Sequence, residues 1–285
     1  MNIPSRVTVY VLADDLAGLN NPFIAQHGAS YWLSLDYRGK KISILFDTGA
    51  YPGPIVENIT RFGLDPHTID YVILSHNHYD HTGGLLGVLE RIDHVVPVIA
   101  PSSLARTSIN VGRRLRIINA PYFPAKFLDE IIARKGYPLL IDEPVKIADG
   151  VWTTGVFDHC SVNNESFFID NGRLVPDMLC DEIALVIDLG EHGLVVTGCA
   201  HPGIDRIVEK ASTIIGKRIK YVLGGLHMVD LEEHRVRETA EKLMKHGVEK
   251  IYPGHCTGLE AEYILKKTYG ENCQVLRVGM NITFS

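Results

Sequence analysis

The feature that most constrains this chain is a stretch of ten residues, 75–84, with the sequence SHNHYDHTGG. Three histidines and one aspartate fall within six positions of it, namely His76, His78, Asp80 and His81. The apolar run 69–74 before the stretch is typical of a buried strand, and the run 85–92 after it is typical of a helix. In α/β proteins, ligands bind at the carboxyl ends of strands. The sequence therefore predicts a ligand site at this strand-to-helix turn.

The residue types in the stretch indicate a metal site. Neutral imidazole nitrogens and carboxylate oxygens are ligands of zinc, iron and manganese. His76 and His78 are two positions apart at a strand end, so an extended backbone points both to the same side. Asp80 and His81 follow where the chain turns, and two pairs of ligands in one turn suit two metal ions better than one. The alternative, a surface turn of ordinary polar residues, explains this density of ligand-type side chains less well.

The composition is that of a globular protein with a large core, because 46% of the 285 residues are hydrophobic and 22% are charged. This length allows one large or two small domains, and we expect a single domain over 1–285. The net charge of −6 argues against general binding to nucleic acid or to a membrane surface, although a local basic patch stays open.

The sequence also bears on location and partners. It contains no run of about eighteen apolar residues, so no transmembrane helix is expected, and residues 1–6 lack the pattern of a signal peptide. The five cysteines have no regular spacing, so they do not make a disulfide framework and indicate a reducing compartment. We expect a cytoplasmic protein with a small-molecule substrate and with neither a nucleic acid nor a membrane as partner. The sequence leaves open whether the protein forms a homo-oligomer.

Strand and helix patterns alternate along much of the chain. Hydrophobic patterning predicts strands at 7–12, 29–37, 41–46, 69–74, 95–100, 151–155, 182–189, 194–197, 221–225, 250–253 and 274–278, with 281–284 as an optional extension. It predicts helices at 55–62, 85–92, 126–135, 204–215, 232–246 and 259–269. Two polar stretches, 13–28 and 158–181, are expected to be loops, and the first could cover a site.

The segment 101–149 is less regular, and we interpret it as an insertion or cap beside the core. It carries four arginines, Arg106, Arg113, Arg114 and Arg116. They could hold an anionic substrate such as a phosphate. They could instead be charges on a solvated edge strand that prevent aggregation, and the sequence favours this second interpretation.

Histidines recur at the strand-to-helix turns. After the first stretch they stand at three later turns, as His201, His227 and His255. These positions are topologically equivalent, so the histidines converge on one edge of a sheet. Together they supply enough ligands for a two-metal site. At another strand end, Asp47 could orient a ligand through a hydrogen bond, or it could form an Asx-type turn.

These motifs resemble the metallo-β-lactamase fold superfamily. The residues that carry the resemblance are Asp47-Thr48-Gly49, His76-x-His78-x-Asp80-His81 and Gly254-His255. The sequences DEIAL at 181–185, TGCAH at 197–201, GGLH at 224–227 and PGHCTG at 253–258 are similar to one branch, the 7,8-dihydropterin-6-methyl-4-(β-D-ribofuranosyl)aminobenzene 5'-phosphate synthase-like metal-dependent hydrolases. The resemblance covers nearly the whole chain. It implies an α/β fold, a four-layer αββα sandwich with metals at one edge of the two sheets.

The resemblance also implies roles for the matching residues. His76 and His78 match ligands of the first metal. Asp80, His81 and His255 match ligands of the second metal. Asp47 matches the aspartate that orients a ligand without touching the metal.

Other positions depart from the superfamily pattern. Cys199 stands where a bridging aspartate is usual, and a thiolate can ligate zinc in a bridging or a terminal manner. The third histidine of the first metal usually precedes that strand, where His159 is the candidate. We prefer His201, with contact to substrate as its alternative role. His227 has no standard ligand role, so we assign it to contact with substrate or transition state; an extra ligand and a buried structural histidine are the alternatives.

The predicted centre suggests a mechanism. A metal-bound water has its pKa lowered toward 7, so hydroxide becomes available as a nucleophile. We therefore predict an enzyme, a metallo-hydrolase with two divalent ions (zinc first, iron or manganese as alternatives) that cleaves an ester, a phosphoester or a lactone. Asp80 could accept a proton, and His227 could stabilise charge or protonate a leaving group.

Two other functions stay open. The branch resemblance implies a transferase that condenses a pterin diphosphate with a ribofuranosylaminobenzene phosphate, where the metals hold the diphosphate leaving group. The less favoured alternative is a diiron redox protein or a non-catalytic binding protein.

Overall fold

The computed structural model describes residues 3–111, 115–118, 124–158, 160 and 166–285. The expectations for Arg113, Arg114 and His159 fall outside these residues.

The first sheet contains strands from both ends of the chain. Its members are β1 Arg6–Ala13, β2 Ser30–Tyr37, β3 Lys40–Phe46, β4 Tyr71–Ile73, β5 Val96–Ala100, β8 Gly136–Leu140 and β17 Asn281–Phe284. Their order is β17-β1-β2-β3-β4-β5-β8. The pairs from β17 to β3 are antiparallel, and those from β3 to β8 are parallel. The parallel half therefore directs the ends of β3 and β4 to one edge, where the histidine-rich stretch begins.

The second sheet is built from the later part of the chain. Its members are β9 Lys146–Ala148, β10 Val151–Thr153, β13 Leu185–Asp188, β14 Gly193–Thr197, β15 Ile219–Gly225 and β16 Lys250–Gly254. Their order is β16-β15-β14-β13-β10-β9. Strands β14, β15 and β16 are parallel to one another. Their carboxyl ends therefore lie together, and each is followed by a turn that carries one of the later histidines.

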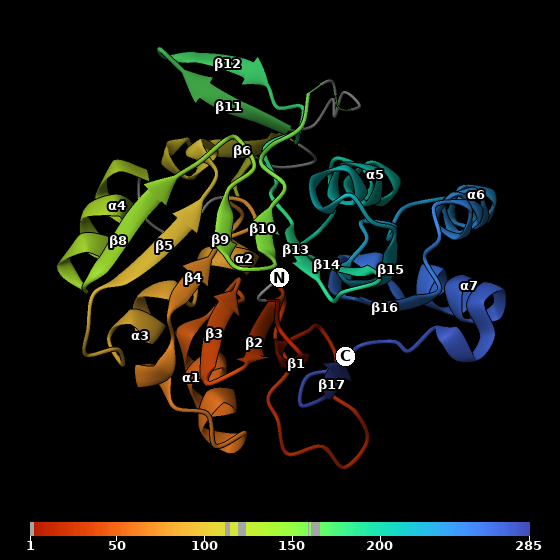
Figure 1. The fold of residues 1–285 in the computed structure, drawn as a ribbon. Helices are drawn as coiled ribbons and strands as arrows, with labels where there is room; N and C mark the ends of the chain where they lie inside the picture. The colour runs from red at the N-terminus through yellow and green to blue at the C-terminus, as the bar shows by residue number, and fades with distance from the viewer. Residues whose placement is uncertain (1–2, 112–114, 119–123, 159, 161–165) are drawn as a thin grey trace.

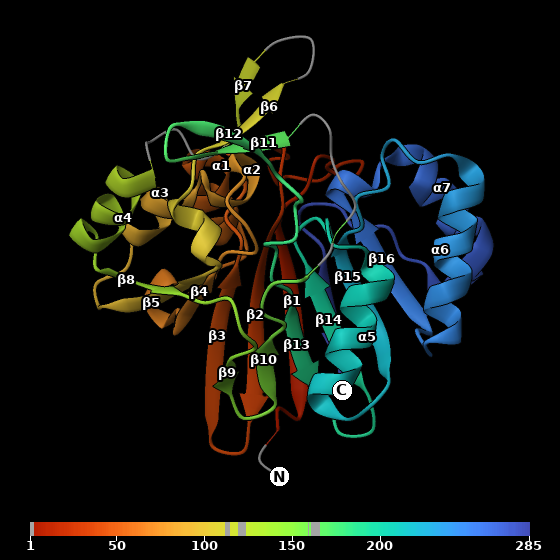
Figure 2. The same ribbon diagram turned by 90° about the horizontal axis from the view of Figure 1, so that it is seen from above.

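Helices cover the outer face of each sheet. Those of the first half are α1 Pro52–Arg61, α2 Tyr79–Thr82, α3 Leu85–Leu89 and α4 Pro124–Ala133, and those of the second half are α5 Ile204–Ile215, α6 Glu233–Lys245 and α7 Leu259–Tyr269. Short 3-10 helices occur at η1 Pro66–Thr68, η2 Ser102–Ala105, η3 His255–Thr257 and η4 Gly270–Asn272. Figures 1 and 2 show α1, α3 and α4 on one side of the sheets and α5, α6 and α7 on the other. The predicted αββα sandwich is confirmed.

The layers are held together because both faces of the central strands are apolar. Leu33 and Ile44 of the first sheet pack in one buried cluster with Leu185 and Val196 of the second sheet. Residues one position away point to the opposite face, so Trp32 packs with the apolar side of α1. Strands buried on both faces are expected to be almost continuously hydrophobic, which is what the sequence shows here.

A separate sheet of four strands lies at one end of the sandwich (Figures 1 and 2). It consists of β6 Ser108–Val111, β7 Leu115–Ile117, β11 Ser166–Asp170 and β12 Arg173–Pro176, in the order β12-β11-β6-β7. The segment 101–149, expected to be one insertion or cap, divides between this sheet and the two main sheets, because β8 and β9 pair with main-sheet strands. The expectation of a loop over 158–181 is wrong, since it contains β11 and β12.

Other differences from the predicted elements are local. The expected strand at 274–278 is not formed as a strand in this described part of the chain; the segment is joined to β16 by hydrogen bonds from the N–H groups of Gln274 and Leu276, and isolated bridges occur at Cys273 and Val278. The expected helix 85–92 ends early, at Leu89. Cys160 and Cys180 form a disulfide, which differs from the reduced state expected of the cysteines. None of the helices in the described residues has the length and apolar character to cross a membrane.

The loop between β1 and β2 is fastened to α1 by one buried side chain. Asn58 is fully buried, and its Nδ2 donates hydrogen bonds to the carbonyl oxygens of Leu12 (2.9 Å) and Ile24 (2.8 Å). Its Oδ1 accepts a hydrogen bond from the backbone N–H of Ile24 at 3.0 Å. The amide thus replaces the backbone pairing that a strand would give this loop.

Replacing Asn58 with alanine is expected to lower the free energy of unfolding by about 2–3 kcal/mol, because it leaves buried backbone groups of the loop without partners. Urea denaturation measures the change. Glu57→Ala, an exposed neighbour on the same helix, serves as the control and should cost less than about 0.5 kcal/mol. Equal stability of the two variants would contradict this role for Asn58.

Candidate metal centre

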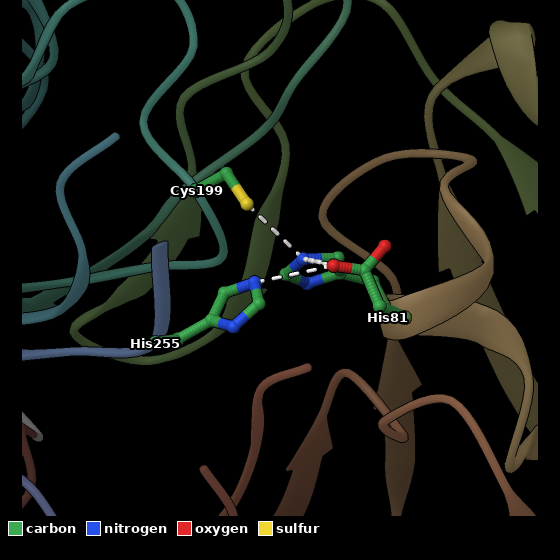
Figure 3. A group of neighbouring side chains, drawn as sticks. His81, Cys199 and His255 are labelled. Carbon is green, nitrogen blue, oxygen red and sulfur yellow. Dashed lines mark hydrogen bonds and ion pairs between the residues drawn. The ribbon is translucent and has the colours of Figure 1, made fainter. Parts of the chain in front are cut away.

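Four buried side chains from distant parts of the chain meet at the edge shared by the two main sheets. They are Asp80, His81, Cys199 and His255, and one ligand atom of each lies within 4.8 Å of the others. His81 Nε2 is 3.2 Å from Cys199 Sγ and 3.4 Å from Asp80 Oδ2, and the same Asp80 oxygen is 3.2 Å from His255 Nε2. Figure 3 shows His81, Cys199 and His255 converging from three separate elements. We call this set the four-ligand group.

A second set, the three-histidine group, lies beside the first and consists of His76, His78 and His201. Their ligand nitrogens also lie within 4.8 Å of one another. Burial and the neighbouring imidazoles lower the pKa of His76 well below its usual value, and burial and His201 lower that of His78 to about 3. Both rings are therefore neutral at pH 7, the state in which a histidine nitrogen can bind a metal.

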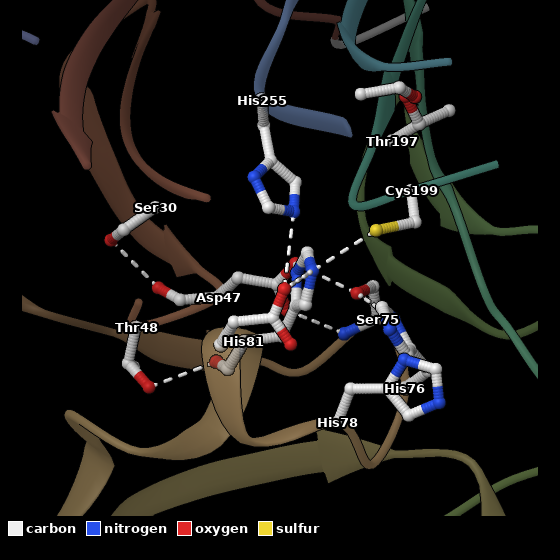
Figure 4. A network of polar contacts seen from close by, with 12 residues as sticks. Ser30, Asp47, Thr48, Ser75, His76, His78, His81, Thr197, Cys199 and His255 are labelled. Atoms are coloured by element: carbon white, nitrogen blue, oxygen red, sulfur yellow. Dashed lines mark hydrogen bonds and ion pairs between the residues drawn. The ribbon is translucent and has the colours of Figure 1, made fainter. Parts of the chain in front are cut away.

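The two groups are connected through the Asp47 carboxylate, which is completely buried. Its oxygens accept hydrogen bonds from the Ser75 backbone N–H and hydroxyl, both at 2.7 Å, and lie 2.7 Å from His81 Nδ1 (Figure 4). Ser75 Oγ in turn lies 2.8 Å from His76 Nδ1. Gly198 leaves room for this network, because a Cβ there would lie 2.8 Å from Asp47 Oδ2. Asp47 thus contacts a ring of one group directly and a ring of the other through Ser75.

Glu182 fixes the ring of His201 in the three-histidine group, as Asp47 fixes the ring of His81. This role of Glu182 was not predicted from the sequence. Its carboxylate is 1% exposed. It accepts hydrogen bonds from the backbone N–H groups of Cys199 (2.8 Å), Ala200 (2.7 Å) and His201 (2.8 Å), and lies 2.9 Å from His201 Nδ1. Burial raises the pKa of Glu182, but its contacts with His201 lower it to about 2. The signal in the sequence was a carboxylate at the start of the apolar run 182–189.

Two aspartates in the loop after β1 hold His255, and they too were missed. Asp14 accepts a hydrogen bond from the His255 backbone N–H at 2.9 Å, and Asp15 lies 2.6 Å from His255 Nδ1. The other oxygen of Asp15 is 2.6 Å from Nδ1 of His27. The signal in the sequence was the pair of aspartates directly after β1, since Asp47 likewise stands directly after β3.

The donor set fits two divalent ions. In His76, His81, His201 and His255, Nδ1 contacts a hydroxyl or carboxylate, so Nε2 is the nitrogen left for a metal. The Nε2 atoms of His76 and His255 are buried and have no hydrogen-bond partner among the described residues. The 3.2–3.4 Å spacings in the four-ligand group match the edges of about 3.4 Å of a tetrahedron with bonds of about 2.1 Å.

Without a cation the four-ligand group holds protons beside the buried carboxylates of Asp80 and Asp47. Burial raises the pKa of the Cys199 thiol, and although burial lowers the pKa of His255, Cys256 and Asp15 raise it well above its usual value. Burial lowers the pKa of His81, but Asp80 and Asp47 raise it to about 10. A proton on His81 therefore balances part of the charge, and a metal ion would displace that proton. This is the behaviour expected of a preformed cation site.

His227 is near both groups but belongs to neither. Its side chain is exposed, its backbone φ is 48°, and its ring centroid is 4.4 Å from that of His201. Its ligand nitrogen lies within 4.8 Å of the sulfur atoms of Cys199 and Cys256. A cavity of about 640 Å³ opens over the centre, and His227 lines it together with His78, Asp80, Cys199, His201 and His255. The exposed position does not fit the alternative of a buried structural histidine.

Replacing Glu182 with glutamine is expected to weaken metal binding at the three-histidine group by about 10–100-fold, because His201 loses the carboxylate that fixes its ring. After dialysis, metal analysis should show fewer ions per chain than in the wild type, with unchanged circular dichroism. Glu191→Gln, at an exposed turn, is the control. Wild-type metal content in Glu182→Gln would contradict this role.

Comparison with known proteins agrees with this geometry. The sequence model of the metallo-beta-lactamase superfamily matches residues 28–255. The chain is 35% identical, over 98% of its length and 97% of the relative, to 7,8-dihydropterin-6-methyl-4-(beta-D-ribofuranosyl)-aminobenzene-5'-phosphate synthase of Methanocaldococcus jannaschii. It is also 30% identical, over 89% of its length and 91% of the relative, to an uncharacterized protein of the same organism.

Solved structures show the same fold. The crystal structure of Tm1679, a metal-dependent hydrolase of the beta-lactamase superfamily, matches with a TM-score of 0.81 and 25% identity over 98% of this chain and 99% of that one. Zn(2+)-bound PqqB from Methylobacterium extorquens shares the fold with a TM-score of 0.56 and 14% identity, over 96% of this chain and 99% of that one. By the extent of the sequence match and by its fold, the chain belongs to the metallo-beta-lactamase superfamily.

Proposed function

We propose that the protein is a two-metal hydrolase of an ester, phosphoester or lactone. The observation that carries the proposal is the pairing of two unlike ligand groups under one cavity. The four-ligand group supplies four ligand atoms, enough for tetrahedral coordination, and includes the Asp80 carboxylate and the Cys199 thiol, which would bind a metal as the thiolate. The three-histidine group offers three imidazole nitrogens and leaves a fourth position to water or substrate, as catalytic sites do.

The proposed ligands are those of the two groups. They are His76, His78 and His201 for one ion, and Asp80, His81, Cys199 and His255 for the other. When bound, divalent ions, with zinc as the first candidate, would supply an acidified water and positive charge for a developing oxyanion. The chain itself fixes the directions of the rings through Asp47, Glu182 and Asp15.

Asp80 and His227 are the proposed catalytic residues. Asp80 Oδ2 lies between the Nε2 atoms of His81 and His255, at 3.4 and 3.2 Å, and its carboxylate lines the cavity. It can therefore receive a proton from a water above the centre. His227 stands on the cavity wall beside His201, where an imidazole can stabilise charge on a substrate or protonate a leaving group.

A second candidate function is supported by the curated relative. A chain that is 35% identical over 98% of its length to a dihydropterin-type synthase could catalyse the same class of condensation. An arylamine would then attack a pterin methylene carbon, with release of diphosphate. Both reactions develop negative charge on oxygen, so the same ligand groups serve either one.

Replacing His78 with alanine is expected to lower kcat/KM by more than about 100-fold, since loss of a direct ligand should exceed the 10–100-fold effect of losing a residue that only orients one. The fold should persist, because His78 stands at the N-cap position of a four-residue helix and its side chain makes no capping hydrogen bond there. Metal analysis, circular dichroism and kinetics on the active substrate test this. Activity retained at the wild-type level would refute metal catalysis at this centre.

The two candidate functions separate in one assay panel. The zinc-loaded protein is tested with phosphodiesters, with lactones, and with dihydropterin diphosphate in the presence and absence of the arylamine phosphate. A hydrolase consumes an ester, phosphoester or lactone with water alone. A transferase releases diphosphate only when the arylamine is present. His94→Ala, which changes an exposed histidine remote from the cavity lining, is the control in each assay.

A further inference from the structure

Part of the wall of the cavity over the ligand groups belongs to the four-stranded sheet. The described residues that this sheet and its flank contribute to the lining are Asn110, Arg116, Ile117, Ile118 and Ser166. The cavity therefore has one side made of candidate metal ligands and one side made of a separate structural unit. A substrate that fills the cavity can therefore contact both the candidate ligands and this sheet.

Three polar residues of that wall form a row across adjacent strands. Ser166 of β11 is directly opposite Asn110 of β6, and Asn110 is directly opposite Arg116 of β7. Residues directly opposite each other on neighbouring strands project from the same face of a sheet. All three side chains therefore share one face, and all three line the cavity. We call them the polar row.

Contacts to the histidine-rich stretch fix which way this face points. Ser108 lies two positions before Asn110 and so shares its face, and its hydroxyl accepts a hydrogen bond from Asn77 Nδ2 at 2.9 Å. The backbone N–H of Tyr79 donates to the Ile118 carbonyl oxygen at 2.8 Å. Asn77 and Tyr79 alternate with the ligands His76, His78 and Asp80. The stretch therefore presents one side to the metals and binds the four-stranded sheet with the other.

The chemistry of the polar row is that of an oxyanion site. A guanidinium, an amide and a hydroxyl supply several hydrogen-bond donors, and the guanidinium suits the geometry of phosphate. Arg116 is the one arginine or lysine among the described residues that line the cavity; the acidic side chains of Asp15, Asp80 and Asp230 also line it. The row therefore carries the one permanently charged cation among these lining residues.

The spacing of the row suits a single phosphate. Neighbouring strands are about 4.8 Å apart, so the outer two residues of the row are separated by about 10 Å at the backbone. The short Ser166 side chain and the long Arg116 side chain can approach a group held over Asn110 from opposite sides.

We propose that Ser166, Asn110 and Arg116 bind a phosphate group of the substrate, separate from the group that reacts at the metals. This inference rests on the proposed function in that the cavity is the substrate site. For Arg116, the proposal differs from the interpretation favoured by the sequence, in which the arginine is a charge on a solvated edge strand that prevents aggregation.

Binding of phenylphosphonate, which has no hydrolysable ester bond, tests the proposal by calorimetry on the zinc-loaded full-length chain. Arg116→Gln and, as an isosteric second variant, Asn110→Asp should each weaken binding about tenfold or more, because a charge-assisted hydrogen bond is lost or a repulsive charge is added. Arg173→Gln is the matched control, since Arg173 lies on β12 at the opposite edge of the same sheet and does not line the cavity. It should bind like the wild type.

Two results would overturn the proposal. In one, Arg116→Gln binds phenylphosphonate normally while His78→Ala does not, which would place the anion on the metals. In the other, benzoate or benzyl alcohol binds as tightly as phenylphosphonate, which would show no preference for phosphate. The assay involves no turnover, so a failure of the proposed hydrolysis leaves its outcome unaffected. If Arg116→Gln loses phosphonate binding but its reaction proceeds normally, the proposed function stands, and the polar row is not a binding site for the phosphate of the substrate.

Discussion

The centre depends on hydrogen bonds that fix imidazole rings through Nδ1. The pairs are Ser75 with His76, Asp47 with His81, Glu182 with His201, and Asp15 with His255. A ring held at Nδ1 has a defined tautomer and direction, so Nε2 points to the centre before any ion arrives. Burying a carboxylate is unfavourable unless donors surround it. Asp47 and Glu182 each have several such donors. The hydrogen bonds of Asp47 hold Ser75 and His81, and those of Glu182 hold the backbone of residues 199–201 after β14.

The parts of the centre that could be predicted from the sequence are residues at the carboxyl ends of strands, including His201 and His255 at the later turns. His76, His78, Asp80 and His81 lie within one turn, so their spacing alone indicates ligation. Glu182 and Asp15 could not be found in this way, because Glu182 precedes His201 by 19 residues and Asp15 precedes His255 by 240. Such pairs form only when the two sheets pack, and neither local propensity nor hydrophobic period describes that packing.

The secondary structure of the fold could also be predicted only in part. Central strands and long helices have strong periods, and most were predicted near their observed bounds. The four-stranded sheet was missed because it combines two segments that are far apart in sequence and because its strands are short and partly exposed. Ile169 and Leu174, for example, are exposed apolar residues of β11 and β12, so no alternation of buried and exposed positions marked these strands. Polar runs such as 158–181 therefore looked like loops.

The contact between Asp14 and His255 spans 241 residues of the chain and has a consequence for biosynthesis. The four-ligand group cannot close until His255 has left the ribosome, although three of its members are made much earlier. Domains generally fold as units, and both sheets also need late strands, β16 in one and β17 in the other, so the sheets and this group are completed by the same late part of the chain. Complete coordination of an ion at this position therefore requires a chain that has been synthesised through His255 and has brought its two sheets together.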